Sequence, residues 1–428
     1  MDSIAPMSGN HSEEILLSRN RLKQLSEHYL LVTLSGLVLA ILANFFWPLT
    51  PVFKGQGAEI LIPFVFLVVG VVFWIAYSTN LTWPKNTKIF LGLVIVYWFY
   101  ARILDSIQND AVNYTAFILP IVIGMIYLKP ITTRTTFFTL DGLSFLIIAI
   151  SIVAQIAVKL DLVAPRTEFP HRLPFFPMLG FDSRWEGVFG NVNYSGPVGA
   201  FLLVYGVGRG KLRGVVIAVA GLVFLLASES RGAMVAAFIG CLIIVVFQPT
   251  WGRWKLSLPL RLSIGSVLIL VPLLASVVSD PTGNGRLTVW KDFLSVWPKE
   301  PIFGVGGDQI AIYIQEGDLT FFSTHGHNVL VQAIVTQGAV GVILISLIFT
   351  LGIVVAVPKK GNSMKISISI LITMILCNVY EDLINGVQLS ITYIAIVLAV
   401  LLGAKPKTKL QASEMNTGPS VYGFGIPK

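Results

Sequence analysis

Residues 328–357 read NVLVQAIVTQGAVGVILISLIFTLGIVVAV, a continuous apolar run without a charged residue. A helix rises about 1.5 Å per residue, so about 20 apolar residues cross the roughly 30 Å hydrocarbon core of a bilayer. Lipid cannot satisfy backbone polar groups, so such a run must be helical. This stretch therefore predicts one membrane-spanning helix, long enough to tilt or to extend beyond the bilayer.

The rest of the chain has the same character. Of its 428 residues 55% are hydrophobic and only 12% are charged, half the usual charged share of a soluble protein. The mean hydropathy is +0.79. The other apolar runs lie at 28–47, 59–78, 89–104, 113–128, 137–158, 192–207, 213–228, 231–247, 262–279, 366–380 and 388–403. The sequence therefore predicts an all-α membrane protein with about 12 transmembrane helices.

Lysine and arginine are unevenly distributed between the two sets of connecting loops. With a cytoplasmic N-terminus, about 20 of the 30 basic residues fall on the cytoplasmic side, as the positive-inside rule expects. The net charge of +8 is then largely a matter of topology. We expect a cytoplasmic segment at 1–27, a transmembrane domain at 28–403 and a cytoplasmic disordered tail at 404–428. Both termini are expected in the cytoplasm, and the long loops 159–191 and 280–327 outside it.

The second long loop contains a helical pattern. It opens with DPTGNG and continues as GRLTVWKDFLSVW, in which the apolar residues recur at helical spacing. These residues are Leu287, Trp290, Phe293, Leu294 and Trp297. The pattern predicts an amphipathic helix lying along the membrane surface.

Three arginines on the outer side run against the positive-inside rule. Arg231 in SESRGAM lies in a tight turn between two spans, where it either snorkels and caps the turn or faces an anionic ligand. Arg286 begins the amphipathic helix and is either a solvated loop charge or part of the same site. For Arg184, in SRWEG, an internal ion pair with Glu186 is the better interpretation.

Histidine is the side chain that titrates near neutral pH, and His327 stands where the second loop enters a span. It could act as a general base or simply cap the helix. GVGGDQ at 304–309 follows no strand and lacks the dinucleotide spacing, so a nucleotide fold is not expected. The outer acidic residues are scattered, and Cys241 and Cys377 lie in apolar runs, so no metal site is expected.

Four sequence blocks together resemble the O-antigen ligase and O-antigen polymerase superfamily of bacterial membrane glycosyltransferases. They are FGNVNYSGPVGAFL, SESRGAMVAAFIG, GRLTVWKDFLSVWPKEPIFGVGGDQI and HGHNVLVQAIVTQGAVGVIL. They cover roughly residues 185–350, and their order and spacing also agree with the family. The other predicted helices support the resemblance only by their hydrophobicity and carry no motif of the family.

The resemblance implies a bundle of the GT-C kind in the bacterial inner membrane, with its active site on the extracytoplasmic face. Family members transfer a glycan from a polyprenyl carrier such as undecaprenyl diphosphate to an acceptor hydroxyl, with inversion and without nucleotide, metal or other cofactor. The implied partners are the lipid-linked donor, a glycolipid or glycan acceptor and membrane lipids, with no nucleic acid. By the family's motifs His327 is the catalytic base, and Arg231 and Arg286 bind the diphosphate. Possible supporting residues are Arg184, Asn193, His325 and Asn328.

Cation-assisted departure of a diphosphate and base-assisted attack by a hydroxyl fit these residue types. A ligase, which uses lipid A core or a similar acceptor, is favoured slightly over a polymerase because the long loop is compact. A flippase or transporter fits less well, since the unusual charges lie at one face rather than at mid-membrane.

Overall fold

The computed structural model describes residues 28–46, 57–76, 79, 81–108, 118–160, 162, 184–185, 192–247, 286–319, 326–357, 362–380 and 391–408. The first half of this part contains α2 (Tyr29–Phe46), α3 (Gly57–Ala76), β1 (Leu81–Thr82), α4 (Lys85–Gln108), α5 (Ile118–Leu128), α6 (Thr133–Lys159), α8 (Val192–Arg209), α9 (Lys211–Ser228) and α10 (Arg231–Phe247). The second half contains α12 (Arg286–Val296), the 3₁₀ turn η6 (Trp297–Lys299), α13 (Gly307–Gln315), α14 (Val329–Thr336), α15 (Gly338–Ala356), α16 (Asn362–Tyr380), α17 (Ile391–Gly403) and β2 (Lys407–Thr408). The predicted helical class is thus confirmed for the described residues.

Several helices have the length and composition of membrane spans. Within the described ranges α6, α9 and α15 are long and apolar enough to cross a bilayer, and shorter apolar helices occur in α3, α5, α10, α16 and α17. Large apolar side chains are exposed on them, such as Val72 and Ile343, each 57% accessible. Such side chains are what lipid-facing surfaces carry. The expected span at 262–279 lies outside the described residues, so the count of twelve stays a prediction.

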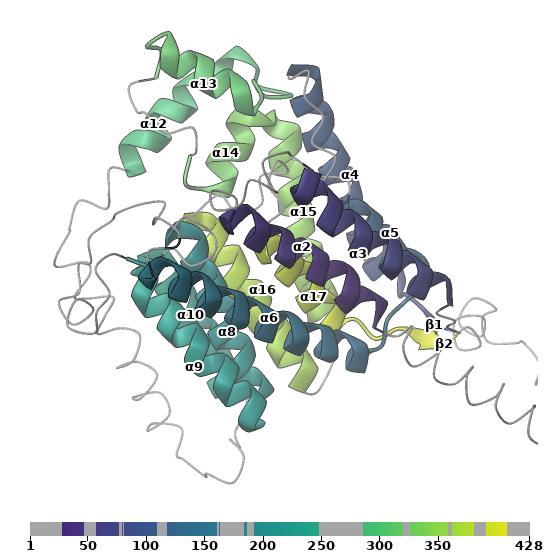
Figure 1. Ribbon diagram of the computed structural model, residues 1–428. Helices are drawn as coiled ribbons and strands as arrows, with labels where there is room; N and C mark the ends of the chain where they lie inside the picture. Colours follow the sequence, from purple (N-terminus) through teal and green to yellow (C-terminus); the bar gives the residue numbers. More distant parts are fainter. Residues whose placement is uncertain are drawn as a thin grey trace, which may run out of the picture.

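The predicted single span at 328–357 is wrong. It forms two helices, α14 and α15, which meet at an angle (Figure 1). Gln337 ends α14, and Gly338 has φ +65°, a left-handed conformation that glycine adopts without strain. A Cβ at Gly338 would lie 2.2 Å from the carbonyl oxygen of Ile302. The break therefore depends on close contact with a distant segment rather than on local hydrophobicity.

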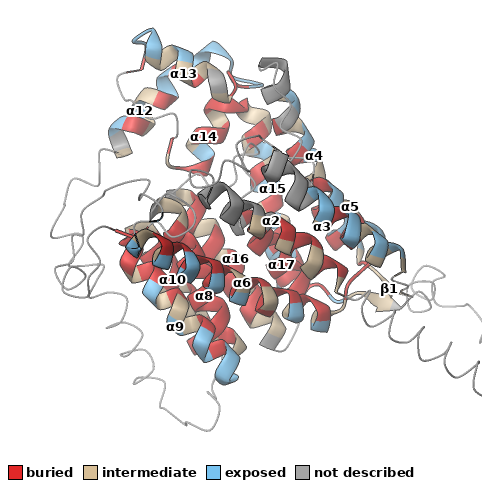
Figure 2. Cartoon of the chain, viewed as in Figure 1, coloured by how far each residue is buried: buried red, intermediate tan, exposed pale blue. Residues whose placement is uncertain are grey.

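The described residues form two hydrophobic cores. The larger core fills the bundle and includes Trp98, Tyr205 and Met374, all buried (Figure 2). The smaller core joins α12, α13 and α14 and consists of Val289, Phe293, Val296, Val305, Ile310, Leu319 and Val335. Figure 1 shows α12 and α13 stacked above one end of the bundle. We call these two helices with η6 and the following turn, residues 286–319, the cap.

The predicted amphipathic helix is present as α12, and its buried face matches the expected one in part, since Phe293 is buried and Trp297 packs against the same core. Among the residues of α12 whose burial the structure describes, Val289, Phe293 and Val296 are buried, whereas Leu294 is 42% exposed. This face packs on α14, and together they form part of the smaller core. At its end Lys299 pairs with Asp318 at 2.7 Å, which holds the pKa of Lys299 above its usual value.

Contacts at the opposite end of the bundle join loops that the charge pattern places on the cytoplasmic side. Leu81 and Thr82 of β1 pair with Lys407 and Thr408 of β2. This strand pair was not expected, and its second strand, β2, lies within the segment 404–428 predicted to be a disordered tail. Nearby, Trp83 Nε1 donates to the Ile126 carbonyl oxygen at 2.7 Å. These contacts agree with the predicted alternation of the loops; which face is cytoplasmic stays a prediction.

A buried ion pair holds α6 to α8. Arg209 donates to both oxygens of Asp141, from Nε at 3.2 Å and from a terminal nitrogen at 3.1 Å. The Tyr205 hydroxyl donates to the same carboxylate at 2.6 Å. Asp141 is 6% exposed, so its charge is neutralised within the protein. The residue therefore has a structural role in the bundle.

We expect Asp141→Ala to destabilise the bundle by about 3 kcal/mol, because it leaves the Arg209 guanidinium and the Tyr205 hydroxyl without their acceptor. This loss of stability is at the low end for buried ion pairs, because the Arg209 side chain is 26% exposed. The measurement is the thermal unfolding midpoint of the purified full-length protein in detergent. The matched control is Asp318→Ala, which breaks the exposed pair with Lys299 and should leave the midpoint unchanged. Equal midpoints for the two variants would contradict this assignment.

Candidate functional site

The second sequence block forms a tight turn between α9 and α10. The helix α9 ends at Ser228, Glu229 has φ +52° and ψ +31°, and α10 begins at Arg231. A left-handed conformation is costly for a residue with a Cβ, on the order of 1 kcal/mol or more. Ser228, Glu229 and Ser230 are all buried. Arg231 is therefore attached to a short, rigid and strained connection.

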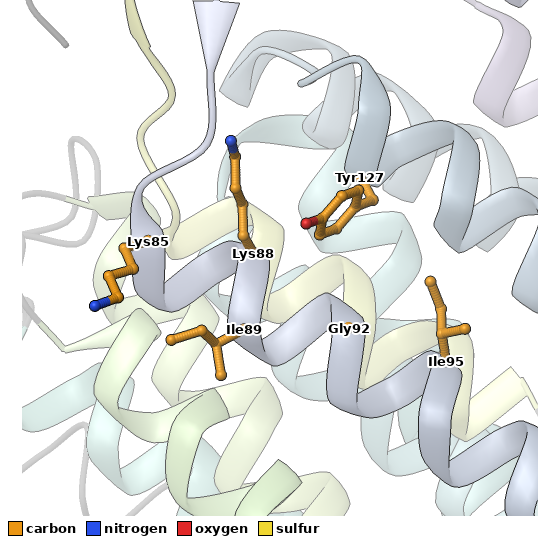
Figure 3. Close-up of a pocket in the computed structure, with 6 residues that line it drawn as sticks. All are labelled: Lys85, Lys88, Ile89, Gly92, Ile95 and Tyr127. Carbon is orange, nitrogen blue, oxygen red and sulfur yellow. The ribbon is translucent and has the colours of Figure 1, made fainter. Parts of the chain in front are cut away.

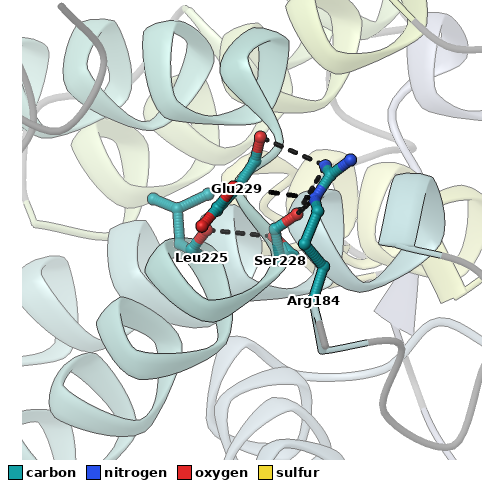
Figure 4. Close-up of polar contacts among 4 residues, drawn as sticks. All are labelled: Arg184, Leu225, Ser228 and Glu229. Carbon is teal, nitrogen blue, oxygen red and sulfur yellow. Dashed lines mark hydrogen bonds and ion pairs between the residues drawn. The ribbon is translucent and has the colours of Figure 1, made fainter. Parts of the chain in front are cut away.

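Arg184 lies across the end of α9 (Figure 4). Its guanidinium donates to the Ser228 carbonyl oxygen at 2.7 Å and 3.0 Å and to the Glu229 carbonyl oxygen at 3.2 Å. The Glu229 carboxylate lies 3.9 Å from Arg184 Nε, and both residues are buried. A cation at a helix C-terminus also interacts favourably with the helix dipole. Arg184 thus fixes the turn that carries Arg231.

Arg184 forms an internal ion pair with Glu229. The pair expected with Glu186 stays a prediction, because Glu186 lies outside the described residues. Trp185 strengthens the same contact. Its backbone N–H donates to the Ala227 carbonyl oxygen at 2.9 Å, and its ring meets Phe224 edge-on with the ring centroids 3.9 Å apart. The end of the first long loop therefore packs on the turn between α9 and α10.

A glycine brings the first and second blocks into contact. A Cβ at Gly196 of α8 would lie 2.3 Å from the Ser230 Cβ, so only glycine allows this approach. Asn193 lies three residues before Gly196 and hence on the same face of α8. The structure thus places Asn193 near the turn that carries Arg231.

His327 and Asn328 form the start of α14. The Asn328 side chain caps the helix by accepting from the N–H groups of Leu330 at 2.8 Å and Val331 at 3.2 Å. His327 precedes this cap with φ +49° and is partly buried. In the described part of the chain, the non-glycine residues with positive φ are Lys211, Glu229 and His327. The side-chain cap of α14 is thus provided by Asn328.

The PIFGVGG segment of the third block packs on the junction of α14 and α15. The N–H groups of Val305 and Gly306 donate to the carbonyl oxygens of Val335 and Thr336. In return, the N–H of Ala339 donates to the Pro301 carbonyl oxygen at 3.0 Å. The glycines of this segment therefore allow close backbone packing on the junction.

We expect Gly338→Ala to loosen the cap, because the new Cβ would both clash with Ile302 and force an alanine to φ +65°. Hydrogen–deuterium exchange in residues 286–319 should rise markedly. Gly317→Ala is the matched control, since Gly317 has φ +81° but nothing within 4 Å of an added Cβ. Unchanged exchange in the Gly338 variant, or an equal rise in both, would show that the contact with Ile302 does not hold the cap.

The candidate residues belong to helices connected by packing. Arg286 is the first residue of α12, α12 packs on α14, and α14 contacts α16, which packs in turn on α10 and so reaches Arg231. The cap is also tied to α4, since the Tyr100 hydroxyl donates to the Phe303 carbonyl oxygen at 3.3 Å, beside its shorter bond to the Gln337 carbonyl oxygen at 2.6 Å. The structure thus connects the helices of Arg231, Arg286 and His327, while His325 lies outside the described residues.

Glu229 was not expected as a partner in the site. Its signal was its place directly before the Ser-Arg pair, at the end of an apolar run. In the described ranges no group of three or more His, Cys, Asp or Glu side chains could hold a metal ion. That the protein works without metal stays a prediction.

These observations define a helical membrane protein with a cap held above one end of the bundle and a candidate site built from short, strained helix starts. Residues 216–346 match the family model described as O-antigen ligase, and Arg231, Arg286 and His327 all lie within the match. The resemblance to the O-antigen ligase superfamily is therefore confirmed over this stretch. No curated protein gives a significant match to the chain.

The family match supports a function of the O-antigen ligase or polymerase type and implies a glycosyltransferase-like activity. It also indicates lipid-linked glycan and acceptor partners. Together with the apolar helices, the match indicates an integral membrane protein.

Proposed function

We propose that this protein transfers a glycan from undecaprenyl diphosphate to an acceptor hydroxyl at the extracytoplasmic face of the bacterial inner membrane. The favoured activity is that of a ligase, with lipid A core or a similar glycolipid as acceptor. A polymerase that extends the glycan on the same donor is the alternative.

The observation that carries the proposal is the backbone of His327, held in a left-handed conformation beside a separate helix cap. Residues in such conformations cluster at active sites, ligand clamps and switch regions. The Asn328 side chain caps α14, so the capping role considered for His327 is filled by Asn328. A general base for the acceptor hydroxyl is the role that fits the matched family.

In the proposed reaction the acceptor oxygen attacks the anomeric carbon of the donor sugar from the side opposite the diphosphate. The hydroxyl proton passes to the His327 imidazole as the bond to oxygen forms. The bond between the anomeric carbon and the diphosphate oxygen breaks, and the carrier leaves as an anion. That anion needs cations rather than a proton, and guanidinium groups match phosphate oxygens in geometry.

Arg231 and Arg286 are proposed to bind this diphosphate. Arg231 is supported by the buried turn to which Arg184 and Glu229 contribute, which limits the directions its side chain can take. Arg286 is supported by the cap, whose core fixes the start of α12. Asn193 is a possible further contact because it shares the face of α8 that meets the turn.

The experiment is reconstitution of the full-length protein into proteoliposomes with a lipid-linked oligosaccharide donor, with and without a separate acceptor glycolipid. If the glycan is transferred only to the added acceptor glycolipid, the protein is a ligase. If the donor glycan is lengthened without that acceptor, the protein is a polymerase. A chelator should leave either rate unchanged, since no metal takes part in the proposed step. Absence of any transfer under all these conditions would refute the proposal.

A further inference from the structure

A cavity of about 370 Å³ lies against the first half of α4, facing the end of α5 (Figure 3). It is lined by Lys85, Lys88, Ile89, Gly92, Ile95 and Tyr127. It is remote from the candidate site, because Lys85 and Tyr100 are 15 residues apart on α4, a distance of about 22 Å along the helix. Tyr100 of α4 donates a hydrogen bond to Phe303 of the cap.

The cavity has a cationic end. Lys85 and Lys88 stand one turn apart at the start of α4, and both are exposed. Neither amine has a hydrogen bond or ion pair with any other residue that the structure describes. The Tyr127 hydroxyl points from α5 toward the side of the cavity where Lys88 extends (Figure 3). Two amines and a phenol together offer donors to an anionic group.

The remainder of the cavity is apolar and open. Ile89 is 43% exposed, and a Cβ at Gly92 would meet nothing within 4 Å. Gly124 of α5 is equally open. From Lys88 to Ile95 the apolar wall runs about 10 Å along α4. A groove of this kind fits an acyl chain rather than a small hydrophilic ion.

Lys129 contributes positive charge nearby, but its amine is already engaged. Its Nζ donates to the carbonyl oxygens of Trp74 at 2.7 Å and Ile75 at 3.3 Å, where it caps the end of α3. The anionic group would therefore be held by Lys85 and Lys88 rather than by Lys129.

We propose that this cavity binds an anionic glycerophospholipid, with its phosphate group at Lys85 and Lys88 and an acyl chain along Gly92 and Ile95. Basic residues between membrane helices next to the bilayer surface are a known way of holding acidic lipid headgroups. The proposal is independent of the catalytic function, since none of its residues belongs to the candidate site.

The test is a titration of the purified full-length protein with phosphatidylglycerol and with phosphatidylcholine, followed by native mass spectrometry. The wild-type protein should bind phosphatidylglycerol more tightly. In the double variant Lys85→Gln and Lys88→Gln the affinity for phosphatidylglycerol should fall about five-fold per lysine, and thus about 25-fold in all. Gly92→Leu fills the groove but keeps both charges, so it should weaken the binding of both phosphatidylglycerol and phosphatidylcholine.

The matched control is Lys211→Gln with Arg213→Gln, which removes two exposed cations at the start of α9, outside the cavity. This control should bind as the wild type does. The proposal is overturned if the control pair loses as much affinity as the cavity pair, or if Gly92→Leu has no effect. It is also overturned if soluble glycerol phosphate displaces the lipid at comparable concentration, since the site would then bind free phosphate.

Discussion

Replacement of His327 by alanine is expected to lower the rate of glycan transfer by a factor of about 10²–10⁴, the usual contribution of a general base. Donor affinity should change little, because the imidazole acts on the acceptor hydroxyl and not on the diphosphate. The measurement is the initial rate of transfer in proteoliposomes at saturating donor, with donor binding determined separately.

The backbone of His327 allows a sharper version of this test. Alanine at φ +49° carries a strain that glycine does not, so His327→Gly should be the more stable of the two variants by about 1 kcal/mol. If His327 is the base, both variants lose activity equally despite this difference in stability. If activity instead follows stability, with His327→Gly active, the residue serves only to shape the start of α14.

Substitution of Arg231 or Arg286 by glutamine is expected to weaken binding of the lipid-linked donor about ten- to 150-fold for each residue. This range corresponds to the loss of about 1.5–3 kcal/mol in a hydrogen bond to a charged group. Lysine at either position should restore only part of the affinity, because its single ammonium cannot make the paired hydrogen bonds of a guanidinium. The measurement is the dissociation constant of the donor.

Arg213→Gln is the matched control for these variants. Arg213 is an exposed cation in the first turn of α9, at the opposite end of that helix from the turn that carries Arg231. It should leave the dissociation constant unchanged. Donor binding that is unaltered in both site variants would refute the assignment of Arg231 and Arg286 to the diphosphate.

Most helices could be predicted from the sequence because each is an apolar run of nearly the right length. The break at Gln337 and Gly338 could not, since apolar residues continue across it and a lone glycine is tolerated in a helix. What decides the break is the backbone of residues 301–306, which hydrogen-bonds to both sides of it. Such a contact between distant segments leaves no local pattern.

The candidate site, too, could be predicted only in part from the sequence. The motifs identified Arg231, Arg286 and His327, and all three fall in the region that matches the O-antigen ligase family. The pairing of Arg184 with Glu229 was missed because the two residues are 45 positions apart. Nothing in the sequence near Arg184 favours Glu229 over the nearer Glu186. The contact of Gly196 with Ser230 likewise follows only from the packing of α8 against the turn.

The central claim is that one imidazole and two guanidinium groups act together on a single lipid-linked donor. The most direct measurement is an electron cryomicroscopy structure of the full-length protein in nanodiscs with undecaprenyl diphosphate bound. We predict density for the diphosphate within hydrogen-bonding distance, about 2.7–2.9 Å, of Arg231 and Arg286, with His327 facing the side from which an acceptor would approach. A diphosphate bound elsewhere, with these three side chains apart from it, would contradict the account.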